Sequence, residues 1–149
     1  MIAKRSNVCL FSVDETSPVA FTAYADDDDS YEASEIIRFE SVVSNIGLFY
    51  DATSSIFYCP HHGIYMFTIH IMSFNNEYMY ARIMHEDDRL VSVDADDASG
   101  VYNQASNTVL VECHPYERVW VEASSCCGRL WSTSERFSTF SGFMVTRLS

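Results

Sequence analysis

Apolar and polar residues alternate with a period of two along much of the chain, a pattern that predicts β-strands. It is clearest at 63–74, where every second residue from Tyr65 to Ile71 is apolar. Turns are expected at 45–47 and 60–63, which contain Asn, Gly or Pro. Further strands are expected at 36–43, 55–59, 77–85, 90–93, 108–113, 118–123 and 137–148. We find no helical periodicity, so the pattern favours an all-β sandwich or barrel.

A second pattern is the fixed spacing of aromatic and turn residues between positions 39 and 67. It comprises Phe39, Asn45, Tyr50, Phe57, Gly63, Tyr65 and Phe67. This spacing resembles the signature of the globular-head domain of complement C1q, although Ile69 stands where that family usually has Phe or Tyr. The segments that resemble other strands of the family are 19–23, 104–110, 118–121 and 137–143. The resemblance therefore covers residues 18 to 148.

The resemblance implies a C1q-like globular domain at residues 18–149, preceded by an N-terminal arm at residues 1–17. It implies a jelly-roll β-sandwich of about ten antiparallel strands, like that of the tumour necrosis factor superfamily. A chain of 149 residues can bury roughly 68–70% of its unfolded surface as one domain. No collagen-like Gly-x-y repeat is present. We therefore expect a stand-alone head, or a head excised from a longer chain.

The same resemblance implies a homotrimer, and the apolar pattern gives a physical reason for one. The strand at 63–74 is apolar on both alternations, and so is the last strand at 137–148. One face would fill the core, and the other must be covered because large apolar patches are rarely left in water. Contacts around a three-fold axis would cover it, whereas a monomer would have to hide both faces behind loops. The residues expected in the core and the subunit interface are Tyr65, Met66, Phe67, Ile69, Phe140 and Phe143.

The chain is strongly acidic, with a formal net charge of −12. This charge argues against nucleic acid and anionic membrane surfaces as partners, since both need basic patches. It leaves simple solubility, calcium binding or a cationic partner open. No apolar run reaches the ~20 residues of a membrane span, so we expect no membrane insertion. No signal-peptide segment follows the basic start, and secretion is implied by the resemblance alone.

Two acidic segments predict different things. The four aspartates at 26–29 indicate a mobile, solvated connection. The second segment consists of Asp94, Asp96, Asp97 and Asn103. It lies between two expected strands, where the resemblance implies a calcium site near the apex of the trimer. Ca²⁺ takes about six to eight oxygen ligands, and the amide of Asn103 in place of an acid should weaken such a site. An ordinary acidic loop is the alternative.

Cysteine and histidine residues do not indicate a site. The five cysteines are Cys9, Cys59, Cys113, Cys126 and Cys127. Cys59 and Cys113 fall in strand-like segments and are expected to be buried thiols, whereas the pair at 126–127 could form a disulfide or stay unpaired. No cysteine spacing resembles a zinc site. The histidines of the 60–63 turn are expected to be exposed, and those at 70, 85 and 114 to be isolated structural residues.

No arrangement of residues predicts catalysis. The chain has no Gly-x-Ser-x-Gly elbow. It has no phosphate-binding glycine loop among its five glycines and no recognisable acid/base pair of carboxylates. We therefore expect that the protein is not an enzyme.

The first functional hypothesis is a secreted, extracellular, lectin-like protein of pattern recognition, as in invertebrate innate immunity. Three identical weak sites would gain avidity on a repetitive glycan or microbial surface. Trp131, with Arg129 near it, is the residue expected to stack on sugar rings, with core packing as the alternative for Trp131. Trp120, between two valines, is expected in the core. The other hypotheses are an extracellular signalling ligand that binds a protein receptor and an acidic, calcium-associated structural or matrix protein.

Overall fold

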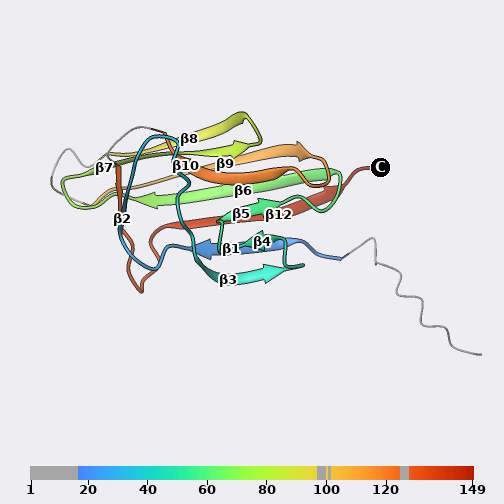
Figure 1. The fold of residues 1–149 in the computed structure, drawn as a ribbon, viewed down its shortest axis with the longest axis horizontal. Coiled ribbons are helices and arrows are strands. Elements are labelled where there is room, and N and C mark those ends of the chain that lie inside the picture. Colours follow the sequence, from blue (N-terminus) through green and yellow to red (C-terminus); the bar gives the residue numbers. More distant parts are fainter. Residues whose placement is uncertain (1–16, 97–99, 101, 125–127) are drawn as a thin grey trace, which may run out of the picture.

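The computed structural model describes residues 17–96, 100, 102–124 and 128–149. These residues form two five-stranded antiparallel sheets and a small two-stranded sheet (Figure 1). The predicted arm therefore lies outside the described residues except for Ser17. In the same part of the chain, no helix has the length and apolar character needed to cross a membrane.

The strands agree in type and order with the all-β expectation. We call the sheet with the order β3-β1-β12-β6-β9 sheet 1, and the sheet with the order β4-β5-β10-β7-β8 sheet 2. The remaining strands, β2 and β11, pair with each other. The strands are β1 Ala20–Tyr24, β2 Asp29–Tyr31, β3 Ser41–Ile46, β4 Tyr50–Asp51, β5 Ile56–Tyr58, β6 Gly63–Met72, β7 Tyr78–His85, β8 Asp88–Asp96, β9 Gln104–Cys113, β10 Arg118–Ala123, β11 Gly128–Leu130 and β12 Thr139–Arg147.

Aromatic and branched side chains fill the space between sheets 1 and 2. Tyr65, Phe67 and Ile69 on β6 are completely buried, as the alternation predicts. Phe140 on β12 is also completely buried. The ring centroids of Phe67 and Phe57 lie 5.5 Å apart across the two sheets. The aromatic residues that recur at fixed spacing in the sequence therefore pack into one core between the two sheets.

β8 and β3 are among the strands whose bounds differ from the sequence-based expectation. β8 extends to Asp96, well beyond the expected 90–93, because it pairs with β7 along its length despite its acidic residues. β3 begins only at Ser41. The apolar alternation before it belongs to a segment that lies against β10, where the Ile37 N–H donates to the Val121 carbonyl at 2.9 Å.

The acidic run at 26–29 agrees with the expectation only in part. Asp29 begins β2, which pairs with β11. The Asp28 carboxylate lies 2.9 Å from the Arg129 guanidinium, and Asp29 forms an ion pair with Arg38. Asp26, Asp27 and Asp28 are exposed, as expected of a solvated connection, whereas Asp29 is half-buried and belongs to a strand.

Candidate functional site

Three aromatic side chains meet at the end of the sandwich where β6 ends and β7 begins. The Trp131 ring packs against Phe74 and Tyr102, with centroid distances of 4.8 Å and 5.0 Å. The backbone N–H of Trp131 donates to the Met72 carbonyl at 2.8 Å, and the Ser138 hydroxyl donates to the backbone carbonyl of Trp131 at 2.9 Å. Trp131 is half-buried and Tyr102 is 42% exposed. A fixed backbone thus presents ring surface to solvent.

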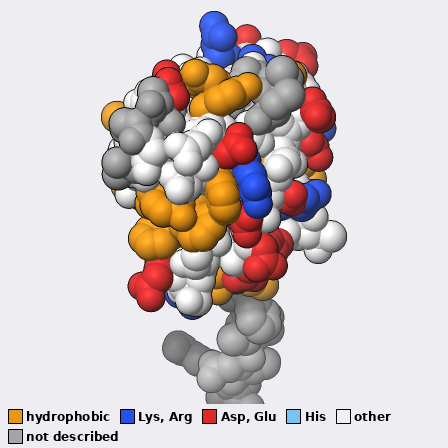
Figure 2. Space-filling model, turned by 90° about the vertical axis from the view of Figure 1, so that its left-hand side faces the viewer, with side chains coloured by type: hydrophobic (Ala, Val, Ile, Leu, Met, Phe, Trp, Pro, Cys, Tyr) orange, Lys and Arg blue, Asp and Glu red, His pale blue; other side chains and the backbone are white. Residues whose placement is uncertain are grey.

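Arg129 adds a cation to these rings. Its guanidinium carbon lies 3.9 Å from the centre of the Phe74 ring, where a positive charge is attracted by the ring quadrupole. The same guanidinium holds Asp28 in the ion pair described above. We call Phe74, Tyr102, Arg129 and Trp131 the aromatic cluster. Figure 2 views this end of the molecule and shows hydrophobic side chains beside basic and acidic ones.

The structure brings the two residues singled out in the sequence, Arg129 and Trp131, to one surface. Sequence analysis missed Phe74 and Tyr102, which come from connections distant in the chain. Each is an aromatic residue just outside a strand, after β6 and before β9 respectively. The sequence offered no such signal for Phe74, which fell at the end of the strand expected at 63–74, and loops at one end of a sandwich converge only in three dimensions.

Trp120 does not lie in the core, which corrects the sequence-based expectation. Val119 and Val121 on either side are completely buried, so the alternation turns Trp120 to the outer face of sheet 2. Its indole N–H donates to the Glu122 carboxylate at 3.1 Å. Glu122 is only 6% exposed and also accepts a hydrogen bond from Arg82 at 2.8 Å. The outer face of β10 therefore carries a polar network.

Of the four predicted calcium ligands, the structure describes Asp94, Asp96 and Asn103. Asp94 and Asp96 are exposed on β8, and the Asn103 amide donates to the Asp96 backbone carbonyl at 2.6 Å. Asp97 lies outside the described residues. Asp94 is the main cause of the raised pKa of Tyr80. Among the residues that the structure describes, no group of three close His, Cys, Asp or Glu side chains includes Asp94 or Asp96.

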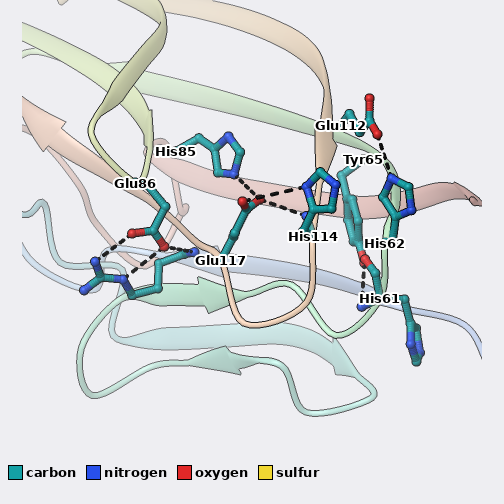
Figure 3. A network of polar contacts seen from close by, with 9 residues as sticks. His61, His62, Tyr65, His85, Glu86, Glu112, His114 and Glu117 are labelled. Carbon is teal, nitrogen blue, oxygen red and sulfur yellow. Dashed lines mark hydrogen bonds and ion pairs between the residues drawn. The ribbon is translucent and has the colours of Figure 1, made fainter.

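Four histidines lie at the opposite end of the sandwich from the aromatic cluster (Figure 3). The His62 Nε2 lies 2.6 Å from Glu112 Oε1, and the His62 ring stacks on the His114 ring with 4.4 Å between centroids. The His85 Nε2 lies 2.7 Å from Glu117 Oε2. The expectation that the histidines at 85 and 114 are isolated is therefore wrong.

The carboxylates at this end are held in their ionised form. The hydrogen bond with His62 keeps the pKa of Glu112 below its usual value. Burial acts to raise the pKa of Glu117, but hydrogen bonds with the His114 N–H and the His85 ring outweigh it, so the pKa is lowered. Both carboxylates therefore carry their negative charge beside imidazole rings at neutral pH.

The two buried thiols of this region are close to each other. Cys59 and Cys113 are unpaired and buried, as expected for strand residues. A hydrogen bond with Cys113, together with burial, raises the pKa of the Cys59 thiol well above its usual range. The thiolate is the reactive form of cysteine, so Cys59 is an inert core residue.

The outer face of sheet 1 carries its side chains in rows that cross all five strands. One row, which we call the apolar row, consists of Ile46, Ala20, Phe143, Met66 and Leu110. The neighbouring row consists of Ser44, Thr22, Ser141, Thr68 and Thr108. In the apolar row, Ile46 is 48% exposed, Phe143 39% and Leu110 63%. An exposed apolar stripe of this kind is typical of a surface that contacts a partner.

Comparison with known proteins finds the same family along nearly the whole chain. The family model described as "C1q domain" matches residues 20–145. Complement C1q tumor necrosis factor-related protein 3 of Mus musculus is 32% identical over 128 residues, which are 85% of this chain and 51% of that protein. Caprin-2 of Danio rerio is 30% identical over 110 residues, which are 73% of this chain and 12% of that protein. The matched part of the chain thus spans about half the length of the first relative and 12% of the second.

Solved structures agree on the fold. The globular domain of zebrafish complement 1qA protein superposes with a TM-score of 0.74 at 18% identity, covering 87% of this chain and 99% of that one. Eiger TNF from S. frugiperda superposes with a TM-score of 0.73 at 9% identity, covering 89% of this chain and 96% of that one. These matches show the jelly-roll fold, and no catalytic family is among the matches named here.

Proposed function

The chain belongs to the C1q domain family, and from this premise we propose that it is a secreted, homotrimeric recognition protein. In this proposal its loop end binds glycans or microbial surface molecules. The observation that carries the proposal is the aromatic cluster, in which rings and a cation from separate connections share one partly exposed surface. Ligand sites combine apolar surface with a few fixed polar groups, and the cluster has both.

The chemistry of the cluster suits a sugar. Aromatic side chains offer flat apolar surface at little cost in conformational entropy, and Trp131 and Tyr102 both remain partly open to solvent. Arg129 and Asp28, paired at 2.9 Å, can donate and accept hydrogen bonds with hydroxyl groups at the rim of the rings. A sugar ring stacked on the cluster would meet both kinds of group at once.

The apolar row supports the trimer. Its side chains cross sheet 1 from one edge to the other, and a head-to-tail contact with two further copies would remove them from water. Three loop ends would then point in the same direction. Weak individual sites on such an assembly gain affinity for a repetitive surface, because the second and third contacts form within one complex.

We also propose that the protein binds Ca²⁺, with one chain supplying part of the coordination shell. Asp94 and Asp96 offer the hard oxygen ligands that Ca²⁺ prefers. Within the described residues, neither belongs to a group of three close His, Cys, Asp or Glu side chains. A complete coordination shell would have to draw on further groups, such as those of neighbouring copies. Calcium titration of the Asp94→Asn variant and the wild type would reveal their contribution as a difference in uptake.

The test of glycan recognition is an array of glycans probed at millimolar calcium and again with a chelator. We expect selective signals that fall strongly for Trp131→Ala and for Tyr102→Ala. Tyr116→Ala is the matched control, since Tyr116 is an aromatic residue with 89% exposure outside the cluster. The proposal fails if the wild type binds no glycan, or if both cluster variants bind as well as the control.

A signalling ligand with a protein receptor is the second candidate function. Trp, Tyr and Arg are the residues most enriched at protein-binding hot spots, and the aromatic cluster contains all three. The name of one relative by sequence, complement C1q tumor necrosis factor-related protein 3, refers to tumor necrosis factor. No glycan signal, together with nanomolar capture of one membrane protein that is lost in Trp131→Ala, would favour this function over the first.

A further inference from the structure

Two imidazoles and a carboxylate converge where the chain enters β6 and leaves β9. One possible ligand atom from each of His62, Glu112 and His114 lies within 4.8 Å of the other two. We propose that these three side chains form a binding site for a divalent transition-metal ion such as Zn²⁺, which we call the histidine site. It is distinct from the aromatic cluster and from Asp94 and Asp96.

Strand register explains why the three residues meet. Gly63 is the partner of Cys113 in the β6–β9 ladder, so His62 and His114, one step further along, lie opposite each other. Their rings are stacked with an interplanar angle of 9°. Glu112 is the partner of Ile64 and reaches diagonally across the ladder to His62. Diagonal neighbours on antiparallel strands are within reach of long side chains.

The backbone beneath the histidine site is fixed. The Leu148 N–H donates to the His62 carbonyl at 2.9 Å. A Cβ at Gly63 would lie 2.5 Å from the Thr146 carbonyl oxygen, so only glycine allows β12 to approach this closely. The ligand-bearing residue His62 therefore stands on a short segment that is held on both sides.

The chemistry of the three donors favours a transition metal over calcium. Imidazole nitrogen suits Zn²⁺, Cu²⁺ and Ni²⁺, whereas Ca²⁺ takes oxygen ligands. Two histidines and one glutamate form a known type of three-ligand zinc set, with a fourth position open to water or another ligand. Zinc–nitrogen bonds are about 2.0–2.1 Å long, so the rings must turn until both lone pairs face the ion. The side chains of His114 and Glu112 are 58% and 52% exposed, which leaves room for that turn.

A further carboxylate, that of Glu117, lies beside the His114 ring. Glu117 Oε1 lies 3.8 Å from His114 Nδ1, and a proton on this nitrogen leaves the lone pair on Nε2. Glu117 is held by the His114 backbone N–H at 2.8 Å and by the His85 ring at 2.7 Å (Figure 3). A carboxylate that accepts a hydrogen bond from the second ring nitrogen of a metal-binding histidine fixes the ring and raises the basicity of the ligand, and Glu117 is placed to do so when the His114 ring turns. An ordinary ion pair with Glu112 would use one imidazole, whereas a metal ion would use both.

The test is calorimetric titration of ZnCl₂ into chain that carries no polyhistidine tag, with Co²⁺ absorption as a second readout of coordination. We expect saturable binding of about one Zn²⁺ per chain. His62→Ala, His114→Ala and Glu112→Gln should each weaken binding at least about tenfold, since even the loss of a residue that only orients a ligand costs that much. His70→Ala is the matched control, because His70 is an exposed histidine near the far end of β6 and should leave binding unchanged.

Two outcomes would overturn the proposal. The first is the absence of saturable Zn²⁺ binding by the wild type. The second is binding that survives in His62→Ala and His114→Ala but is lost in Cys113→Ser, which would assign the metal to the neighbouring group of His85, Cys113 and Glu117. All three proposed ligands come from one chain, so the result does not depend on the oligomeric state or on glycan binding.

Discussion

Gly142 is a residue at which the backbone of β12 packs closely against the aromatic core. A Cβ at this position would lie 2.5 Å from Phe67 Cδ1 and 2.8 Å from Phe21 Cε1. We expect Gly142→Ala to lower the free energy of unfolding by about 1–3 kcal/mol, because both rings must leave their packed positions. Denaturant titration measures this loss. Val145→Ala, on an exposed position of the same strand, should change it much less.

Glu122 is a nearly buried charge whose partners depend on it. It accepts hydrogen bonds from Arg82 and from the Trp120 indole. Glu122→Ala should cost on the order of 3 kcal/mol in unfolding free energy, because it leaves the Arg82 guanidinium without its carboxylate in a largely buried setting. Asp28→Ala breaks an exposed ion pair and should cost at most about 1 kcal/mol. Equal losses in the two variants would contradict this explanation.

At the scale of the element, the β9–β10 connection is stabilised by an ionised Glu117. Its pKa is lowered in the folded state, so its contribution to stability is present above the usual glutamate value of about 4.5 and is lost as the pH falls below it. Glu117→Gln should therefore unfold at a lower temperature than the wild type at pH 7. The difference should shrink as the pH falls below about 4.5. Thermal unfolding in metal-free buffers measures this, and parallel pH profiles would be inconsistent with it.

The long, regular strands were predictable because their pattern reflects burial on one face. Residues 63–74 and 118–123 gave β6 and β10 almost to the residue. The segment before β3 has the same apolar alternation but is not part of that strand. The Ile37 side chain is buried, and its backbone forms a hydrogen bond with β10 outside a regular ladder. Trp120 was misplaced because two buried valines fix which face of β10 is inner, and an aromatic residue can cover the other face too.

At the scale of the whole molecule, the apolar row predicts how the chain assembles. The wild type should scatter light with about three times the 17.0 kDa mass of one chain at micromolar concentration. Leu110→Asp should shift this mass towards the monomer, because it places a carboxylate in the covered face, at the β9 end of the apolar row. Leu48→Asp adds the same charge in the exposed turn after β3 and should leave the trimer intact. A wild type that scatters as one chain would rule the trimer out.

The candidate sites were less predictable than the fold. Trp131 and Arg129 could be singled out as loop residues, but their contacts with Phe74 and Tyr102 depend on how distant connections meet. The same holds for His62 and His114, which are 52 positions apart in the numbering and become neighbours only through the β6–β9 register. The spacing of residues along the chain indicates local periodicity, but it does not indicate which strand ends lie next to each other in the fold.

Strand β6 separates the two ends of the molecule by roughly 33 Å, given about 3.3 Å per residue over its ten residues. Leu148 lies beside His62, because its N–H donates to the His62 carbonyl, whereas Trp131 is bonded to Met72 at the other end of β6. Figure 1 shows the C-terminus at the end of the sandwich opposite the tip of the β6 arrow. A protein immobilised on a sensor chip through a linker after Ser149 would hold Trp131 outward and the histidine site towards the chip. Attachment chemistry alone would thus decide which end of an anchored molecule a dissolved compound can reach.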